Sequence, residues 1–342
     1  MSDQEPAAGD DVAPAVTWPP PASEEEKAER VVALRSRLES ECAGDAQVAR
    51  FCTDGTLERF TRACCYDVDK AEEFMRKALR WRADKQPWAV TCPGCAASPR
   101  AHSLRCIGTD SSGRPVLYHC FAQADGRHVA AHNTAHLMRI LEDCCALMDA
   151  AEPQVPQWVW VFDFHGYGLW DNNPSTVVAA AQFLPMHPNR LFKVLMLDAP
   201  TAFSAIWGVV SGFLTDITKA KITFTSLAEL RDVAAGFAGD EVAAWLEAEA
   251  SENRRLTAAG GRAAASKRYW EAPAAAGPGE APAHDPRGTP SFVSSPQFFS
   301  PTHWGGAADA TAAPPPGEGE EPPPAPPARS GSWLWGSSAT AS

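Results

Sequence analysis

Basic residues are scarce relative to acidic ones in this 342-residue sequence. It holds 30 Lys and Arg against 42 Asp and Glu, which gives a formal net charge of −12. Nucleic-acid binding depends on clustered cations that neutralise phosphates, so this balance argues against a general nucleic-acid-binding protein. Any attraction to an anionic membrane must then come from a local patch of the surface.

Long apolar runs are also missing. No stretch approaches the roughly 18 uninterrupted apolar residues that a membrane span requires. The first residues, MSDQEPAAGDD, are acidic, whereas a secretory signal peptide begins with basic residues and continues with an apolar segment. We therefore expect a cytoplasmic protein whose association with membranes is peripheral and reversible.

Catalytic sequence motifs are absent as well. The sequence contains no G-x-S-x-G nucleophile elbow, no G-x-x-x-x-G-K phosphate loop and no H-E-x-x-H helix. His165 lies close to Asp163 in the chain, but no nucleophile is nearby in sequence. We expect a protein that is not an enzyme and that needs no cofactor.

Cysteines are confined to one part of the chain, since all ten lie between Cys42 and Cys145. Disulfide frameworks are usual in short secreted domains, so reduced thiols are the better interpretation for a chain of this size. Four residues here have the spacing C-x2-C-x6-H-x3-C: Cys92, Cys95, His102 and Cys106. Three thiolates and an imidazole suit tetrahedral zinc. A zinc-stabilised loop is thus an alternative to a plain cysteine-rich connection.

Composition divides the chain into two tails and a middle part, which the pattern of helices and strands divides again. Residues 1–22 form an acidic tail and residues 258–342 a tail rich in Pro, Ala and Gly. Both bury too little apolar surface to offset the entropy of ordering, and both are predicted to be disordered. Between them, residues 23–90 form a helical segment and residues 91–257 the main domain. We expect residues 23–257 to fold without the tails.

Two aromatic clusters interrupt the second tail, at residues 292–304 and 332–335. One interpretation is that these aromatic residues are incidental. The other is that they are short docking motifs for a protein partner or a membrane interface, where Trp is favoured.

Helical signals precede strand signals. Ser23 and Glu26 can form a capping box, and Asp67 is a good N-cap for a helix that ends at Pro87. Four short apolar runs then alternate with helical stretches, at residues 115–121, 158–164, 191–198 and 221–225. Runs of this length suit strands that are buried on both faces. The alternation predicts an α/β fold with a largely parallel sheet.

Several motifs, taken in order, resemble the CRAL-TRIO (Sec14-like) family of lipid-binding proteins. Residues 57–82, LERFTRACCYDVDKAEEFMRKALRWR, are similar to the family's LLRFLRARKFDV segment and the amphipathic helix that follows it. Further matches follow in the family's order: DSSGRPVLY at 110–118, VFDFHGYG at 161–168, HPNRL at 187–191, LDAPTAFSAIW at 197–207, FLTDITKAKITF at 213–224 and GFAG at 236–239. Each motif alone is weak, but their shared order makes the resemblance strong.

The resemblance implies a mixed, largely parallel sheet that forms the floor of an apolar pocket, and a mobile amphipathic helix that closes over one lipid. The expected pocket residues are Tyr118, Trp160, Phe162, Phe164, Phe203 and Trp207. The expected gate helix spans residues 201–214 and presents Phe203, Ile206, Trp207, Val210, Phe213 and Leu214. Periodicity alone would instead favour an ordinary core helix here.

The headgroup positions depart from the family's pattern. Members that bind phosphatidylinositol hold it with a basic pair, a glutamate and a lysine, and the corresponding residues here are Cys64, Cys65, Asn189 and Lys221. The lost groups would each supply charge-assisted hydrogen bonds of about 1.5–3 kcal/mol. We therefore expect a neutral or zwitterionic lipid, oriented by neutral donors such as the Tyr118 hydroxyl. Arg190 and Lys221 are the headgroup candidates, although Arg190 could equally pair with a carboxylate such as Asp163.

The resulting hypothesis is a lipid-transfer or lipid-presenting protein. It would bind a phospholipid or another hydrophobic ligand, contact membranes transiently and offer its C-terminal tail to a protein partner. The alternative is an adaptor that binds membranes or proteins without transferring lipid, stabilised by a zinc-binding Cys/His loop.

Overall fold

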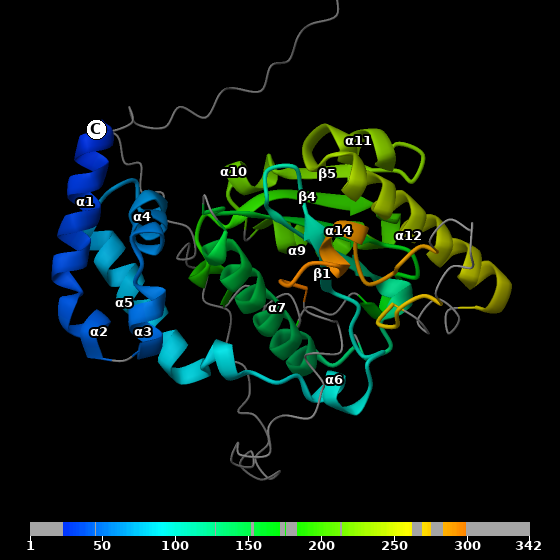
Figure 1. Cartoon of the computed structure of the whole chain (residues 1–342), viewed down its shortest axis with the longest axis horizontal. Helices are drawn as coiled ribbons and strands as arrows, with labels where there is room; N and C mark the ends of the chain where they lie inside the picture. The colour runs from blue at the N-terminus through cyan, green and yellow to red at the C-terminus, as the bar shows by residue number, and fades with distance from the viewer. Residues whose placement is uncertain are drawn as a thin grey trace, which may run out of the picture.

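The computed structural model describes residues 23–44, 46–126, 128–151, 154–171, 175, 183–212, 214–261, 269–274 and 283–298. These residues form a group of N-terminal helices beside a five-stranded sheet with helices on both faces (Figure 1). The predicted α/β fold with a mixed, largely parallel sheet is confirmed. The predicted tail at residues 1–22 lies outside the described residues.

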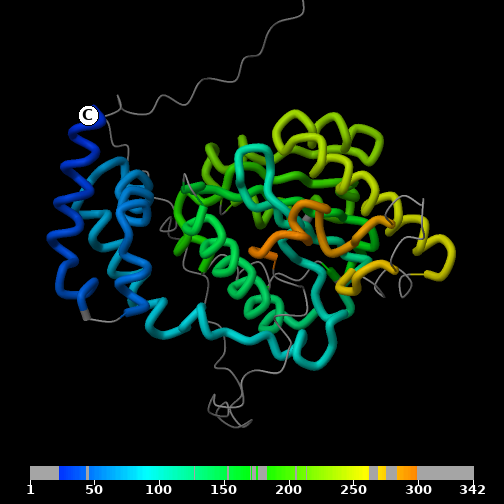
Figure 2. The backbone as a smooth tube through the Cα atoms, in the orientation of Figure 1, coloured from blue at the N-terminus to red at the C-terminus, as the bar shows by residue number. Residues whose placement is uncertain are grey.

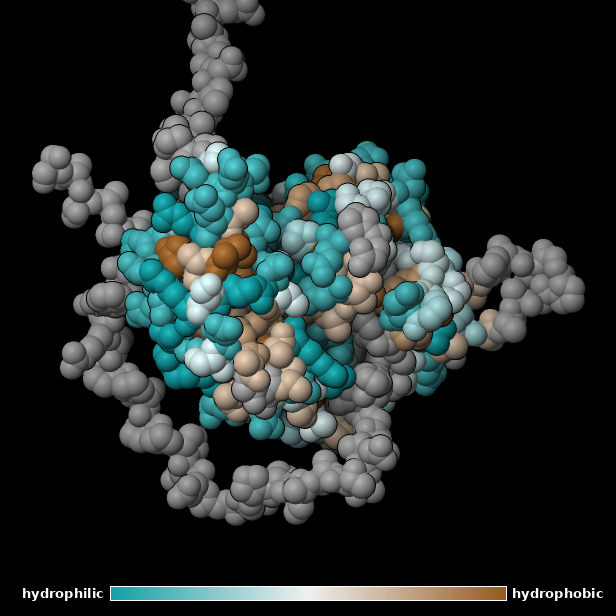
Figure 3. Space-filling view, turned by 60° about the vertical axis from the view of Figure 1, so that its left-hand side comes forward, coloured by the Kyte–Doolittle hydropathy of each residue, from teal (hydrophilic) through white to brown (hydrophobic). Residues whose placement is uncertain are grey.

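The N-terminal part is helical: α1 (Glu24–Arg37), α2 (Glu39–Gly44), α3 (Ala46–Phe51), α4 (Asp54–Ala63) and α5 (Val68–Lys85). The predicted capping box forms, since the side chains of Ser23 and Glu26 each accept the other's backbone N–H. Asp67 caps α5 as predicted. These helices pack around a core of their own that includes Leu57 and Phe60. Their outer surface is largely hydrophilic (Figure 3).

The sheet has the strand order β1-β2-β3-β4-β5: β1 (Arg105–Thr109), β2 (Pro115–Cys120), β3 (Trp158–Asp163), β4 (Leu191–Leu197) and β5 (Ile222–Thr225). β1 and β2 are antiparallel, and the other neighbouring pairs are parallel. The four predicted apolar runs correspond to β2 through β5. β1 carries no such run, because its sequence RCIGT begins with Arg105 and contains Gly108.

Helices cover both faces of the sheet (Figure 1). One face, called the α7 face, packs against α6 (Pro93–Ala97), α7 (Ala130–Ala150) and α9 (Ser204–Gly212). The other, called the α12 face, packs against α11 (Leu230–Ala238) and α12 (Asp240–Gly260). The connections contain short elements: η1 (Pro87–Ala89), η2 (Phe121–Gln123), η3 (Leu169–Asp171), η4 (Leu184–Met186), η5 (Thr201–Phe203), α10 (Asp216–Lys219) and α14 (Pro290–Val293). Among the described residues, no helix is both long enough and apolar enough to cross a membrane.

Part of the C-terminal region packs on the sheet domain, so the disorder predicted from residue 258 onward needs correcting. Residues 283–298, drawn in orange in Figure 2, pass beside β1 and α12. Tyr269 is 2% exposed and Phe292 is 5% exposed. Phe292, from the first aromatic cluster, therefore belongs to the core. The second cluster, residues 332–335, lies outside the described residues.

The C-terminal segment also covers the outer edge of β1. The Thr289 N–H donates to the carbonyl of Ile107 at 2.7 Å. A Cβ at Gly108, whose φ is +153°, would lie 2.7 Å from Thr289 Oγ1, so the strand needs glycine at this approach. Because an open strand edge exposes unpaired backbone groups, this cover protects β1 from pairing with another chain.

Candidate functional site

Alternation along β3 brings its aromatic side chains to the α7 face. Successive strand residues point to opposite faces of a sheet. Trp160 and Phe162 pack in the core of the α7 face, and Phe164, just beyond the strand, continues their row. Val159 and Val161 belong to the core of the α12 face.

Five predicted pocket residues meet on the α7 face, and we call them the aromatic layer: Trp160, Phe162, Phe164, Phe203 and Trp207. Trp160 and Phe162 stack with ring centroids 4.9 Å apart. Phe203 lies 4.6 Å from Phe164 and 6.0 Å from Trp207. Trp207 then meets Phe224 of β5 edge-on at 5.5 Å. The aromatic contacts therefore extend from the sheet through η5 and α9 to the edge strand.

α9 has apolar residues on a buried side and on an exposed side. Ile206 is 7% exposed, whereas Val209 is 42% exposed and Phe224, on the neighbouring strand, is 51% exposed. Val210 and Leu214 are partly buried, and Phe213 lies outside the described residues. The predicted gate segment thus presents apolar surface to the core and to the outside together.

The aromatic layer contains a buried donor without a partner. The Trp160 indole N–H has no hydrogen-bond acceptor among the described residues, and neither has that of Trp158. A buried unpaired donor costs about 1–3 kcal/mol. An acceptor on a bound molecule would remove this cost.

An open hollow of about 290 Å³ adjoins the layer at the edge of the sheet. Its lining is mixed: Met196, Ala199 and Phe224 are apolar, and Asp198, Thr225, Ser226 and Glu229 are polar or charged. Pockets for drug-sized ligands commonly measure about 300–1,000 Å³. A ligand with long acyl chains therefore needs more room than this hollow offers.

Tyr118 lies on the opposite face, which corrects its assignment to the pocket. Strand alternation turns it toward α12, where its ring meets Trp245 edge-on at 5.3 Å. Its hydroxyl donates to Asp163 Oδ2 at 2.8 Å and accepts from Asn253. Burial raises the pKa of Tyr118. It cannot orient a ligand on the α7 face.

Both headgroup candidates have intramolecular partners. Arg190 is 3% exposed and pairs with Asp149 at 3.1 Å, not with Asp163. Lys221 Nζ donates to the carbonyl of Leu191 at 2.6 Å, and burial lowers the pKa of this lysine. Arg190 therefore joins the start of β4 to the C-terminal end of α7, and Lys221 joins the starts of β4 and β5.

The residues that replace the family's headgroup ligands either make structural contacts or are exposed. Asn189 donates through Nδ2 to the carbonyl of Arg59 at 3.0 Å, which ties α4 to the start of β4. Cys64 is partly buried at the end of α4, and Cys65 is exposed.

Asp163 and His165 do not form an acid–base pair. The Asp163 carboxylate accepts from Arg254, with N···O distances of 3.0 and 3.1 Å, and from the Tyr118 hydroxyl. The ring of His165 instead contacts Thr257 Oγ1 at 2.9 Å through Nε2. The carboxylate is thus engaged in a buried structural network.

The structure brings together three of the four residues of the predicted Cys/His ligand set. Cys92, Cys95 and His102 lie together, and their fourth neighbour is His136 of α7. Cys106 points elsewhere, because its place on β1 turns its thiol toward the carbonyl of Gly108. Sequence spacing could not identify His136, which lies 41 residues beyond Cys95.

The fold and the aromatic layer define an α/β domain with an apolar core between its sheet and the helices of the α7 face. Residues 104–237 match the family model of the CRAL/TRIO domain, and this part of the chain is a CRAL-TRIO domain. The resemblance drawn from the sequence motifs is confirmed.

Curated relatives and a solved structure agree with this assignment. The phosphatidylinositol transfer protein CSR1 of Eremothecium gossypii is 26% identical over 51% of this chain and 43% of its own length. The phosphatidylinositol/phosphatidylcholine transfer protein SFH7 of Arabidopsis thaliana is 23% identical over 48% of this chain and 33% of its own length. The chain thus spans less than half the length of these relatives. The crystal structure of Sfh5 has the same fold, with a TM-score of 0.52 at 12% identity, over 63% of this chain and 85% of that one.

Proposed function

We propose that this protein binds one lipid between β3 and α9 and transfers it between membranes or presents it at their surface. The observation that carries the proposal is the aromatic layer, which continues from the buried floor of the sheet through Trp207 to the exposed Phe224. Val209 of α9 is exposed as well. Burial of apolar surface contributes about 25 cal/mol per Å², so such a surface suits acyl chains.

The lipid class follows from the polar groups near the layer. The relatives' names support a phospholipid. Since Arg190 and Lys221 are engaged with protein acceptors, we propose a neutral or zwitterionic headgroup over inositol phosphate. The free Trp160 N–H suits an ester or phosphate oxygen of the ligand.

The proposed action is binding and transfer without covalent chemistry on the lipid. Asp163 is occupied by Arg254 and Tyr118, so it does not activate His165. The membrane contact would be peripheral and transient, made by the exposed apolar residues of α9 and β5.

Lipid extraction and native mass spectrometry of the purified full chain test this function. We expect one co-purifying phospholipid per chain, and transfer of phosphatidylcholine between vesicles at a higher rate than phosphatidylinositol. A folded protein that neither carries lipid nor takes it up from vesicles would support the adaptor instead.

The gate is tested by placing a charge on its exposed side. Val209→Asp should weaken vesicle binding and slow lipid exchange at least about tenfold, because a carboxylate at a membrane interface loses hydration. Because Val209 is exposed, the variant should remain folded by circular dichroism. The matched control is Val32→Asp on α1, a residue that is 64% exposed and far from the aromatic layer in sequence. Equal exchange by both variants would exclude α9 as the gate.

The Trp160 N–H is tested by Trp160→Phe, which keeps an aromatic ring and removes the donor. If the donor binds the lipid, affinity should fall about five- to tenfold, as expected for one hydrogen bond. Trp158→Phe is the control, because it removes another unpaired indole donor outside the aromatic layer. Lipid titration followed by fluorescence measures both, and an unchanged Trp160→Phe affinity would contradict the role of the donor.

A further inference from the structure

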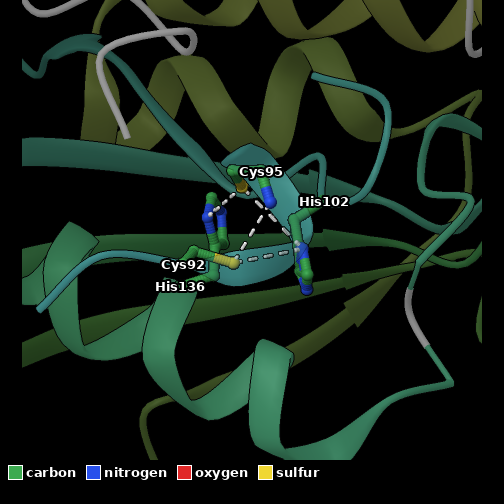
Figure 4. A group of neighbouring side chains, drawn as sticks. All are labelled: Cys92, Cys95, His102 and His136. Carbon is green, nitrogen blue, oxygen red and sulfur yellow. Dashed lines mark hydrogen bonds between the residues drawn. The ribbon is translucent and has the colours of Figure 1, made fainter. Parts of the chain in front are cut away.

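A second cluster of reactive side chains lies away from the aromatic layer. It comprises two thiols and two imidazoles, from Cys92, Cys95, His102 and His136, and we call it the Cys2His2 cluster. All four residues are buried, with exposed fractions of 0–7%. Figure 4 shows the four side chains turned toward one another from α6, the loop after it and α7.

The distances in this cluster are close to those of a tetrahedral site. Its four potential ligand atoms all lie within 4.8 Å of one another. Cys95 Sγ is 3.3 Å from His136 Nδ1, and both sulfurs are 4.0 Å from His102 Nδ1. Zinc bonds of about 2.3 Å to sulfur and 2.0 Å to nitrogen place tetrahedral ligand atoms roughly 3.3–3.8 Å apart. Small side-chain shifts would therefore bring all four atoms onto one ion.

Contacts around the cluster orient its ligand atoms. His136 Nε2 lies 2.8 Å from the carbonyl oxygen of Leu104, which can only accept, so Nε2 carries the proton. The Nδ1 lone pair then faces Cys95. Such a hydrogen bond from the far ring nitrogen commonly holds a metal-binding histidine. The Cys95 N–H also donates to Cys92 Sγ at 3.4 Å, which stabilises negative charge on that sulfur.

The local backbone brings the two thiols together. Cys92 is the N-cap of α6 and Pro93 occupies its first turn, so the chain folds back within the C-P-G-C sequence. A Cβ at Gly94 would lie 3.0 Å from His102 Cε1 and 3.2 Å from His132 Nδ1. A side chain at this position would therefore press on the cluster.

We propose that the Cys2His2 cluster binds one structural zinc ion. Two thiolates and two imidazoles in a tetrahedral arrangement favour zinc among the common divalent metals, and four protein ligands leave no open position for catalysis. The ion would join the connection that follows the N-terminal helices to α7, which covers the floor of the lipid site. This site does not depend on the proposed lipid function.

Metal analysis of the purified full chain, kept reduced, tests the proposal. We expect about one zinc per chain in the wild type, and at least tenfold less in Cys95→Ser and in His136→Gln. Two matched controls should keep their zinc: Cys106→Ser, which changes the cysteine that sequence spacing favours, and His132→Gln, one turn earlier on α7.

Cobalt provides an independent spectroscopic readout. Chelator-treated wild type should take up Co²⁺ with the visible bands of a tetrahedral site and a thiolate charge-transfer band, and added zinc should abolish both. This experiment uses the wild type and so gives an answer even if a ligand variant does not fold. Reduced, folded wild type that binds neither metal would overturn the proposal, as would a native disulfide between Cys92 and Cys95 or unchanged zinc in both ligand variants.

Discussion

Glu249→Ala is expected to lower the free energy of unfolding by about 3–5 kcal/mol, because it leaves a buried arginine without its carboxylate. Arg105 is 0% exposed, and its guanidinium donates to Glu249 at 2.8 Å. Gln123 and His284 also contact the same carboxylate, at 2.8 and 2.7 Å. Burial alone would raise the pKa of Glu249, but its contacts with His284 and Arg105 lower it overall, so the carboxylate is ionised at neutral pH.

Glu247→Ala is the matched control for this prediction. Glu247 lies in the same helix and pairs with Arg231 at 3.3 Å, but both side chains are more than 40% exposed. Exposed ion pairs contribute about 0–1 kcal/mol, so this variant should unfold almost as the wild type does. Urea unfolding followed by tryptophan fluorescence compares the two. Equal destabilisation by both substitutions would show that the buried network contributes no more to the free energy of unfolding than an exposed ion pair does.

Removal of the C-terminal segment is the second change with a large expected effect. A chain that ends at residue 261 loses Tyr269 and Phe292 from the core, each worth about 1.5–3 kcal/mol of apolar burial. It also loses the carbonyl of Pro286, which accepts from Arg105 at 2.7 and 3.0 Å. The truncation also removes the carbonyl of Asp285, which accepts from the Trp245 indole at 2.8 Å. We expect this chain to be at least about 3 kcal/mol less stable, or insoluble.

A chain that ends at residue 298 is the control, because it keeps all of these contacts. It should match the full chain in its unfolding midpoint and in lipid uptake. The comparison bears directly on the domain boundary, since the sequence alone places the end of the folded part at residue 257. If the two shortened chains were equally stable, the boundary at residue 257 would be correct and residues 269–298 would not contribute to stability.

Local patterns in the sequence were sufficient for most elements of the fold. The capping box of Ser23 and Glu26 and the Asp67 cap involve residues three positions apart, so the sequence contains the whole interaction. The strands β2 through β5 can likewise be predicted from their apolar runs, because a strand buried on both faces needs apolar residues throughout. β1 could not be predicted in this way, since its sequence has little strand character and its pairing with β2 compensates for this.

The aromatic layer was predictable in composition but not in orientation. A two-residue period assigns Trp160 and Phe162 to one face together, and the structure agrees. The period within β2 does not reveal which face of the sheet lies under α9. Tyr118 was therefore placed on the wrong side, and only the packing of Trp245 and Asp163 around it shows its role.

By itself, the sequence determined the class of fold, the order of most of its helices and strands, and the CRAL-TRIO resemblance, because these depend on neighbours along the chain. The tertiary structure alone decided which distant residues meet. His136 replaces Cys106 beside Cys95 across 41 residues, and Pro286 reaches Arg105 across 181. Such contacts depend on how elements pack once apolar surface is buried, and no local period or spacing encodes that packing.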